Sequence, residues 1–140
     1  MNVVYTAEAL ATGDGRNGHA RSTDGKVDVT LATPKEMGGT GEGTNPEQLF
    51  AAGYAACFHS ALRLVGKQAK ANVDDSAVGA KVGIGPNDAG GFGLTVTLEV
   101  SLPHLSAEQA RELTERAHQV CPYSNATRGN IDVELQIAED

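Results

Sequence analysis

Positive charge is scarce in this sequence. Its 140 residues include 11 Lys and Arg against 18 Asp and Glu, which gives a net charge of −7. A nucleic-acid-binding domain carries a basic patch or stripe, and none stands out along this chain. The charge balance therefore argues against nucleic acid as a partner.

Long apolar runs and a signal peptide are missing as well. His59, Ser60 and Arg63 interrupt the most apolar stretch, which argues against a membrane-spanning helix. The first residues, 1–8, have neither the basic start nor the apolar core of a signal peptide. We therefore expect a cytoplasmic protein without a membrane partner.

Cysteine is also rare, because the chain has only Cys57 and Cys121. In a reducing compartment, two cysteines that meet are more plausibly a redox couple than a structural disulfide. A hydrophobic content of 40% with 21% charged residues is typical of a soluble globular protein. At this length we expect a single domain over residues 1–140.

A long apolar helix is predicted over residues 45–65. Asn45 is a favourable N-cap, Pro46 suits the first helical position and Glu47 lies in the first turn. The opposite side of the helix is mostly alanine, so we expect the helix to be enclosed on most sides. Its core-facing stripe at helical spacing consists of Phe50, Gly53/Tyr54, Cys57, Ala61 and Leu64/Val65.

Short strands are predicted before and after this helix. A second helix begins at a capping box formed by Ser106 and Gln109, and Pro122 ends it, with a loop to follow. The order βββαββαβ predicts an α+β domain whose two helices cover antiparallel sheet. The predicted strands are residues 3–10, 19–22, 27–31, 78–84, 92–102 and 131–137.

Cys57 is the candidate nucleophile. A cysteine alone in an apolar helix is more often a core residue. Cys121, however, lies on the apolar edge of the second helix, so the two thiols can meet between helices and sheet. A nucleophilic thiol has to be a thiolate, and apolar surroundings raise the pKa of Cys57, so a nearby cation is needed.

Arg16, in the turn-forming segment 13–18, is the candidate cation, and Glu47 is a candidate for holding it. Ten residues of helix separate Glu47 from Cys57 by about 15 Å. Either Arg16 spans this gap, or Glu47 and Cys57 belong to different chains of a dimer. The simpler alternatives are an exposed turn arginine and an acidic residue that compensates the helix dipole.

Metal and phosphate sites receive little support. The two cysteines with His59 and His118 suit zinc in kind, but Cys57 and His59 are two residues apart on a helix and point in different directions. The glycine-rich segment 38–43 lacks the Lys-Ser/Thr of a phosphate-binding loop. We therefore expect no metal and no bound cofactor.

Two segments closely resemble the OsmC/Ohr family. They are NPEQLFAAGYAACF at residues 45–58 and CPYSNATRGN at residues 121–130, and the second is similar to the organic hydroperoxide resistance branch. The Gly-Arg-Asn-Gly turn around Arg16 also fits, and the resemblance runs nearly end to end. It implies an intertwined homodimer with long central helices and active sites at the subunit interface.

The resemblance also implies a thiol peroxidase that reduces organic hydroperoxides, including fatty-acid hydroperoxides, to alcohols. Cys57 would attack the peroxide and become a sulfenic acid, and Cys121 would condense with it to a disulfide. Arg16 would stabilise the thiolate and Glu47 would orient Arg16. Dihydrolipoyl groups on lipoylated proteins would then reduce the disulfide again.

Aromatic side chains near Cys57 suggest the substrate. Phe50, Tyr54 and Phe58 would line an apolar channel suited to bulky alkyl peroxides, from which hydrogen peroxide gains nothing. Three alternatives stay open. They are a less selective peroxidase of the OsmC branch, a non-catalytic protein that binds small molecules in the same pocket, and a zinc-binding structural protein.

Overall fold

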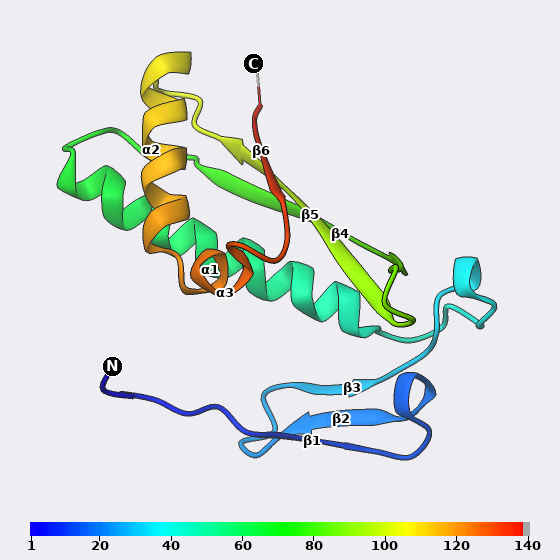
Figure 1. Ribbon diagram of the computed structural model, residues 1–140. Helices are drawn as coiled ribbons and strands as arrows, with labels where there is room; N and C mark the ends of the chain where they lie inside the picture. The colour runs from blue at the N-terminus through cyan, green and yellow to red at the C-terminus, as the bar shows by residue number, and fades with distance from the viewer. Residues whose placement is uncertain (139–140) are drawn as a thin grey trace. The chain divides into compact units, whose positions relative to one another are not determined.

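The computed structural model describes residues 1–138, which divide into two compact units, one from Met1 to Leu49 and one from Phe50 onward. Figure 1 shows a small sheet in the first unit, and a second sheet with helices in the other. The predicted α+β class is therefore confirmed. That residues 1–140 form a single domain stays a prediction.

The first unit contains a three-stranded antiparallel sheet in the order β1-β2-β3. Its strands are β1 (Ala9–Thr12), β2 (His19–Ser22) and β3 (Asp28–Thr30), with Ala20 opposite Ala11 on one side and Val29 on the other. Two single turns of 3₁₀ helix, η1 (Gly15–Asn17) and η2 (Lys35–Met37), lie in its connections.

The first predicted strand is only partly correct. We expected it over residues 3–10, whereas β1 begins at Ala9 and residues 1–8 are exposed and outside any strand. Alternating residues become a strand only where a neighbouring strand can pair with them. The register of β1 with β2 ends at Ala9 opposite Ser22, which explains where the strand starts.

Helix α1 (Pro46–Gln68) begins as predicted and runs three residues further. Asn45 caps it: its Oδ1 accepts the Gln48 N–H at 2.9 Å, while the Gln48 Oε1 accepts the Asn45 N–H at 3.3 Å. Its buried residues are Tyr54, Phe58, Ala61, Leu62, Val65 and Gly66.

The expectation that α1 is enclosed on most sides is wrong for a single chain. Ala52, Ala56, Ser60 and Leu64, spaced four residues apart, are all exposed; we call them the open stripe of α1. By length and composition α1 could also cross a membrane, contrary to expectation, with 33% of its most apolar window buried. The core helix of a soluble protein passes the same test, so this is weak evidence for a membrane span.

The second sheet has the order β4-β5-β6. β4 (Ala77–Pro86) and β5 (Phe92–Ser101) form an antiparallel hairpin, as predicted. β6 (Val133–Ile137) pairs with β5 in parallel, so the expectation of purely antiparallel sheet is wrong. The helices between β5 and β6 carry the backbone back along the sheet, so that Val133 at the start of β6 lies opposite Val96 in the middle of β5; a parallel pair requires such a crossover connection.

Two helices follow this hairpin. α2 (Ala107–Val120) has the predicted capping box of Ser106 and Gln109. α3 (Pro122–Thr127) replaces the predicted loop, because Pro122 ends α2 and at the same time occupies the first turn of the next helix. The core of this unit comes from α1, β5 and α2, through Tyr54, Phe58, Leu62, Val65, Val96, Leu98, Val100, Ala110, Leu113 and Ala117.

Candidate active site

The two thiols meet, as predicted. The Sγ atoms of Cys57 and Cys121 lie 3.8 Å apart, and both cysteines are free. Cys57 is half-buried on α1, whereas Cys121 has 0% of its surface exposed. A reagent therefore reaches the pair through the Cys57 sulfur.

Cys121 owes its position to the junction of α2 and α3. It is the C-cap of the first and the N-cap of the second, so both helices hold its backbone. Its N–H donates to the Ala117 carbonyl at 2.9 Å, and its carbonyl accepts the Asn125 N–H at 2.9 Å. With both backbone groups satisfied in this way, the direction of the Cys121 side chain is set by two helices.

Burial raises the pKa of the Cys57 thiol, because removal from water disfavours the charged thiolate. The backbone N–H of Tyr123 donates to the Cys57 sulfur and lowers this pKa, by a smaller amount. The neighbouring Cys121 raises it again. The expectation that Cys57 needs a cation to become a nucleophile at neutral pH is consistent with this balance.

Arg16 and Glu47 form an ion pair in the first unit. The Arg16 Nη1 lies 2.7 Å from the Glu47 Oε1 and 3.2 Å from its Oε2. Arg16 is on η1 with 36% of its side chain exposed, and Glu47 is in the first turn of α1 with 13% exposed. Glu47 thus holds Arg16 as predicted, while the catalytic roles of both residues stay predictions.

The site residues belong to the two different units. Arg16 and Glu47 lie in residues 1–49, and Cys57 and Cys121 lie in the part from Phe50 onward. The predicted approach of Arg16 to the Cys57 sulfur therefore remains a prediction.

The predicted substrate residues differ in their exposure. Phe50 is half-buried, whereas Tyr54 and Phe58 are at 0% exposure in the core. Tyr123, which lies in the motif at residues 121–130 but was not predicted as a site residue, is 37% exposed. Its ring centroid lies 6.2 Å from that of Phe50 and 5.5 Å from that of Tyr54. These three rings form an aromatic cluster, and its role as a channel wall stays a prediction.

Ser124 lies in the same motif, and it too was not predicted as a site residue. It is buried, and its hydroxyl bonds to Tyr54 and to His118. A serine in a segment predicted to be a loop gives no reason to expect burial. Only the presence of α3 places it inside the molecule.

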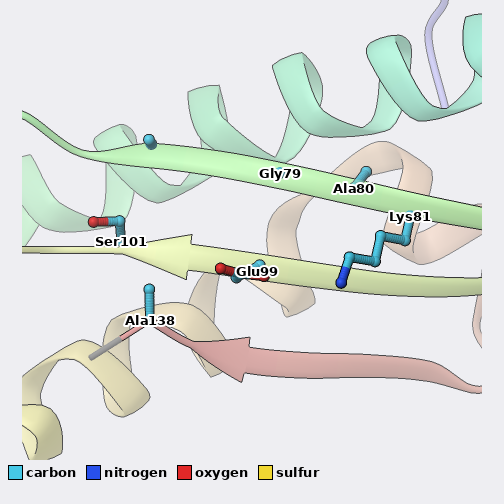
Figure 2. A pocket seen from close by; sticks show the side chains of 7 residues that line it. Gly79, Ala80, Lys81, Glu99, Ser101 and Ala138 are labelled. Atoms are coloured by element: carbon cyan, nitrogen blue, oxygen red, sulfur yellow. The ribbon is translucent and has the colours of Figure 1, made fainter. Parts of the chain in front are cut away.

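A metal site and a functional pocket without predicted site residues are both less well supported in the described part of the chain. Within residues 1–138, no group of three or more His, Cys, Asp or Glu side chains is arranged to hold a metal ion. A hollow of about 300 Å³ lies on β4 and β5 (Figure 2), and no predicted site residue lines it. Its lining is small and mixed: Ala77, Gly79, Ala80, Lys81, Glu99, Ser101 and Ala138.

Comparison with known proteins identifies the family. Residues 39–136 match the model of the family described as OsmC-like protein. A protein of Acinetobacter baylyi is 56% identical over 99% of this chain and 96% of its own length. An organic hydroperoxide resistance protein of Xanthomonas axonopodis pv. citri is 53% identical over 97% of this chain and 96% of its own.

Solved structures agree with this match. The crystal structure of an organic hydroperoxide resistance protein from Elizabethkingia anophelis superposes with a TM-score of 0.94. It is 52% identical, and the superposition covers 100% of both chains. The chain therefore belongs to the OsmC/Ohr family, in its organic hydroperoxide resistance branch.

Proposed function

We propose that the protein is a thiol-dependent peroxidase that reduces organic hydroperoxides, including those of fatty acids, and so defends against organic peroxide stress. The observation that carries this proposal is the 3.8 Å separation of the Cys57 and Cys121 sulfurs. A disulfide needs a sulfur separation of about 2 Å, so a small movement is enough to join them. The names of the similar proteins support organic hydroperoxides as the substrate class.

The first step is attack by the Cys57 thiolate on the terminal oxygen of the hydroperoxide. The O–O bond breaks, Cys57 becomes a sulfenic acid, and the alkoxide takes up a proton and leaves as an alcohol. The Tyr123 N–H donates to the sulfur and favours the thiolate. Arg16, oriented by Glu47, supplies the missing positive charge to the thiolate and to the leaving oxygen.

The second step protects the oxidised sulfur. The Cys121 thiol loses its proton and attacks the Cys57 sulfur, hydroxide leaves and is protonated to water, and a disulfide forms. The two thiols of a dihydrolipoyl group then reduce this disulfide by exchange and close into their own cyclic disulfide. Cys57 is the sulfur that this reductant reaches, since Cys121 is buried.

We take the working form to be a homodimer. The open stripe of α1 presents a mostly apolar helix surface, interrupted by Ser60, that one chain does not cover. A second copy that covers this surface would also explain how Glu47 and Cys57 can act together although they are far apart along α1. Each site could then take residues from both chains.

The proposed substrate selectivity depends on the aromatic residues. Phe50, Tyr54 and Phe58, together with Tyr123, make the surroundings of Cys57 apolar. A bulky alkyl group gains burial there, whereas hydrogen peroxide has no apolar surface to bury. The ratio of kcat/KM for cumene hydroperoxide and hydrogen peroxide tests this, and equal values would contradict it.

The proposed location is the cytoplasm, because the cycle starts from two free thiols, which a reducing compartment maintains. Fractionation of cells that express the full chain tests this. Recovery of the protein in a membrane or an oxidising compartment would count against it.

The deciding experiment follows cumene hydroperoxide consumption by the reduced protein with dihydrolipoamide as reductant. Wild type should turn over, Cys121→Ser should react once and stop, and Cys57→Ser should not react even once. If wild type is as inert as Cys57→Ser, the cysteines are core residues and the chain is better explained as a non-catalytic binding protein.

A further inference from the structure

Three buried or half-buried side chains near the thiol pair carry polar atoms to which the proposed cycle gives no role. Tyr54 is three residues before Cys57, His118 is three before Cys121, and Ser124 is three after it. Three residues make nearly one helical turn, so each of these side chains shares the face of a thiol on its own helix.

The three side chains meet at the Ser124 hydroxyl. Its Oγ lies 2.8 Å from the Tyr54 Oη and 2.8 Å from the His118 Nδ1. Tyr54 and Ser124 both have 0% of their surface exposed. Thr127 completes the group, with its Oγ1 at 3.2 Å from the Tyr54 Oη and donating to the Ser124 carbonyl at 3.2 Å. One hydroxyl on α3 thus bonds to α1 and to α2.

The hydrogen bonds have a consistent direction when His118 is neutral. Burial lowers the pKa of His118, and the charge of Arg128 lowers it further. A neutral ring with an unprotonated Nδ1 accepts the Ser124 O–H, and Ser124 in turn accepts the Tyr54 O–H. Arg128 also donates to the His118 carbonyl at 2.6 Å, which ties the end of α3 to α2 a second time.

Helix α3 needs such ties, because six residues are too few to make a stable helix alone. Its position therefore depends on contacts to its neighbours. Cys121 is its N-cap, so whatever fixes α3 on α1 and α2 also fixes the Cys121 sulfur.

We propose that Ser124 is a positioning residue for the thiol pair: its hydroxyl joins Tyr54 of α1 to His118 of α2 and thereby holds Cys121 beside Cys57. This inference rests on the proposed two-thiol cycle, in which the second step requires Cys121 to stay within reach of the oxidised Cys57. Without the Ser124 hydroxyl, Cys57 still reacts, but the disulfide closes more slowly.

An aromatic disulfide such as 5,5′-dithiobis(2-nitrobenzoate) separates the two steps without any peroxide. The Cys57 thiolate attacks one sulfur of the reagent, forms a mixed disulfide and releases a first arylthiolate. Cys121 then loses its proton and attacks the Cys57 sulfur, which releases a second arylthiolate and forms the protein disulfide. The first release measures Cys57 reactivity, and the second measures how well Cys121 is placed.

Two variants remove the hydroxyls that meet. Ser124→Ala breaks the bonds to both Tyr54 and His118, and the second release should slow by about tenfold. Tyr54→Phe removes one bond and keeps the ring, and should slow it by about threefold. The first release should change by less than about threefold in Ser124→Ala.

The matched control is Thr114→Val, which removes a buried hydroxyl of α2 that donates to the Ala110 carbonyl at 2.7 Å and does not touch the Ser124 group. It should leave both releases unchanged. His118→Asn, whose amide can replace the Nδ1 atom, should preserve the second rate better than His118→Leu.

The outcomes separate this inference from the proposed function. A second release in Ser124→Ala and Tyr54→Phe as fast as in wild type overturns the positioning role. An equal slowing by Thr114→Val also overturns it, because the effect then comes from general destabilisation. If wild type releases two arylthiolates and yet consumes no hydroperoxide, the peroxidase proposal fails while the positioning role stands.

Discussion

Cys57 combines two conditions that oppose each other. Its half-buried position shields a reactive sulfur from water, but the same burial raises the pKa of the thiol. The donor that the structure supplies at the sulfur is the Tyr123 N–H, whose effect on the pKa is smaller than that of burial. A full positive charge is therefore the missing element of the site, and Arg16 is the residue that we propose for it.

Replacement of Glu47 by Gln tests how Arg16 is oriented. The substitution keeps the size of the side chain and removes the charge that holds the Arg16 Nη1 at 2.7 Å. Charge-assisted hydrogen bonds contribute about 1.5–3 kcal/mol, so we expect kcat/KM for cumene hydroperoxide to fall by about tenfold to a hundredfold.

Glu42→Gln makes the same change of charge at an exposed residue of the glycine-rich segment and should leave kcat/KM unchanged. The pH dependence of Cys57 alkylation should shift upward in Glu47→Gln but not in the control. If both variants keep the wild-type efficiency, Glu47 is a dipole-compensating residue without a role in the reaction.

His118 makes stability depend on pH. Its folded pKa is below the ordinary value of 6.5, because burial and Arg128 disfavour the charged ring. Below about pH 6.5, His118 therefore becomes protonated in the unfolded chain while it stays neutral in the folded chain. Acidification consequently favours unfolding. This stability is fully present above 6.5 and is lost as the pH falls through the folded pKa.

Urea unfolding of the reduced protein at neutral and at mildly acidic pH measures this loss. The free energy of unfolding should decrease more in wild type than in His118→Asn, which cannot take up the proton. Identical pH dependence in the two proteins would show that other groups control acid stability.

Two glycines on helix α1 illustrate how position within an element decides the effect of one substitution. Glycine weakens a helix interior by roughly 0.5–1 kcal/mol relative to alanine. A Cβ at Gly53 would meet the Tyr123 Oη at 2.6 Å, and one at Gly66 would meet the Val73 Cγ1 at 2.5 Å. The first atom is the free end of a partly exposed side chain, whereas the second is a short branch of a buried one.

Gly53→Ala should therefore leave the free energy of unfolding unchanged or raise it by up to about 1 kcal/mol, since the Tyr123 ring can swing aside. Gly66→Ala should lower it by about 1–3 kcal/mol, because the core must shift to admit the methyl group. Denaturant unfolding of both variants measures the difference. A stabilising Gly66→Ala or a strongly destabilising Gly53→Ala would contradict the packing described for α1.

The secondary-structure elements differ in how well the sequence predicts them. Alternation predicted β4 and β5, and cap residues predicted the starts of α1 and α2, because both signals are local. The parallel pairing of β6 depends on how the intervening chain returns to the sheet, which no local pattern records. Helix α3 was missed because Pro122 was interpreted only as the end of a helix.

In the candidate site, too, some residues are predicted from the sequence and others depend on how the elements are placed. Cys57, Cys121, Arg16 and Glu47 were predicted from residue type and family motif, and the structure brings each of the two pairs together. The Tyr123 N–H and the Ser124 hydroxyl depend on the placement of α3, so the prediction of a loop after Pro122 gave no reason to expect their contacts.

Across the whole molecule, apolar surface is distributed unevenly. Of the twelve exposed large hydrophobic residues within residues 1–138, eight lie in residues 1–49, among them Val3, Val4 and Tyr5. Among the buried hydrophobic residues of the described chain, only Leu31 and Ala32 lie in residues 1–49. So small a core does not stabilise a unit of this size, and its apolar surface requires cover from elsewhere. A second copy of the chain is the partner that we propose.

A charge on the open stripe of α1 tests this assembly. Ala56→Glu places a carboxylate in the middle of the stripe, where a partner helix would have to bury it unpaired, whereas Ala69→Glu makes the same change at an exposed residue just beyond α1. Light scattering after size exclusion should give twice the chain mass for wild type and Ala69→Glu. Ala56→Glu should be monomeric or should dissociate at concentrations where the control does not.

The same pair of variants links assembly to catalysis, because the proposed site takes residues from both chains. Ala56→Glu should therefore lose peroxidase activity together with the dimer, even though it changes none of the four site residues. An active monomer would show that Arg16, Glu47 and the thiols of one chain suffice for peroxidase activity. The open stripe of α1 would then serve another purpose.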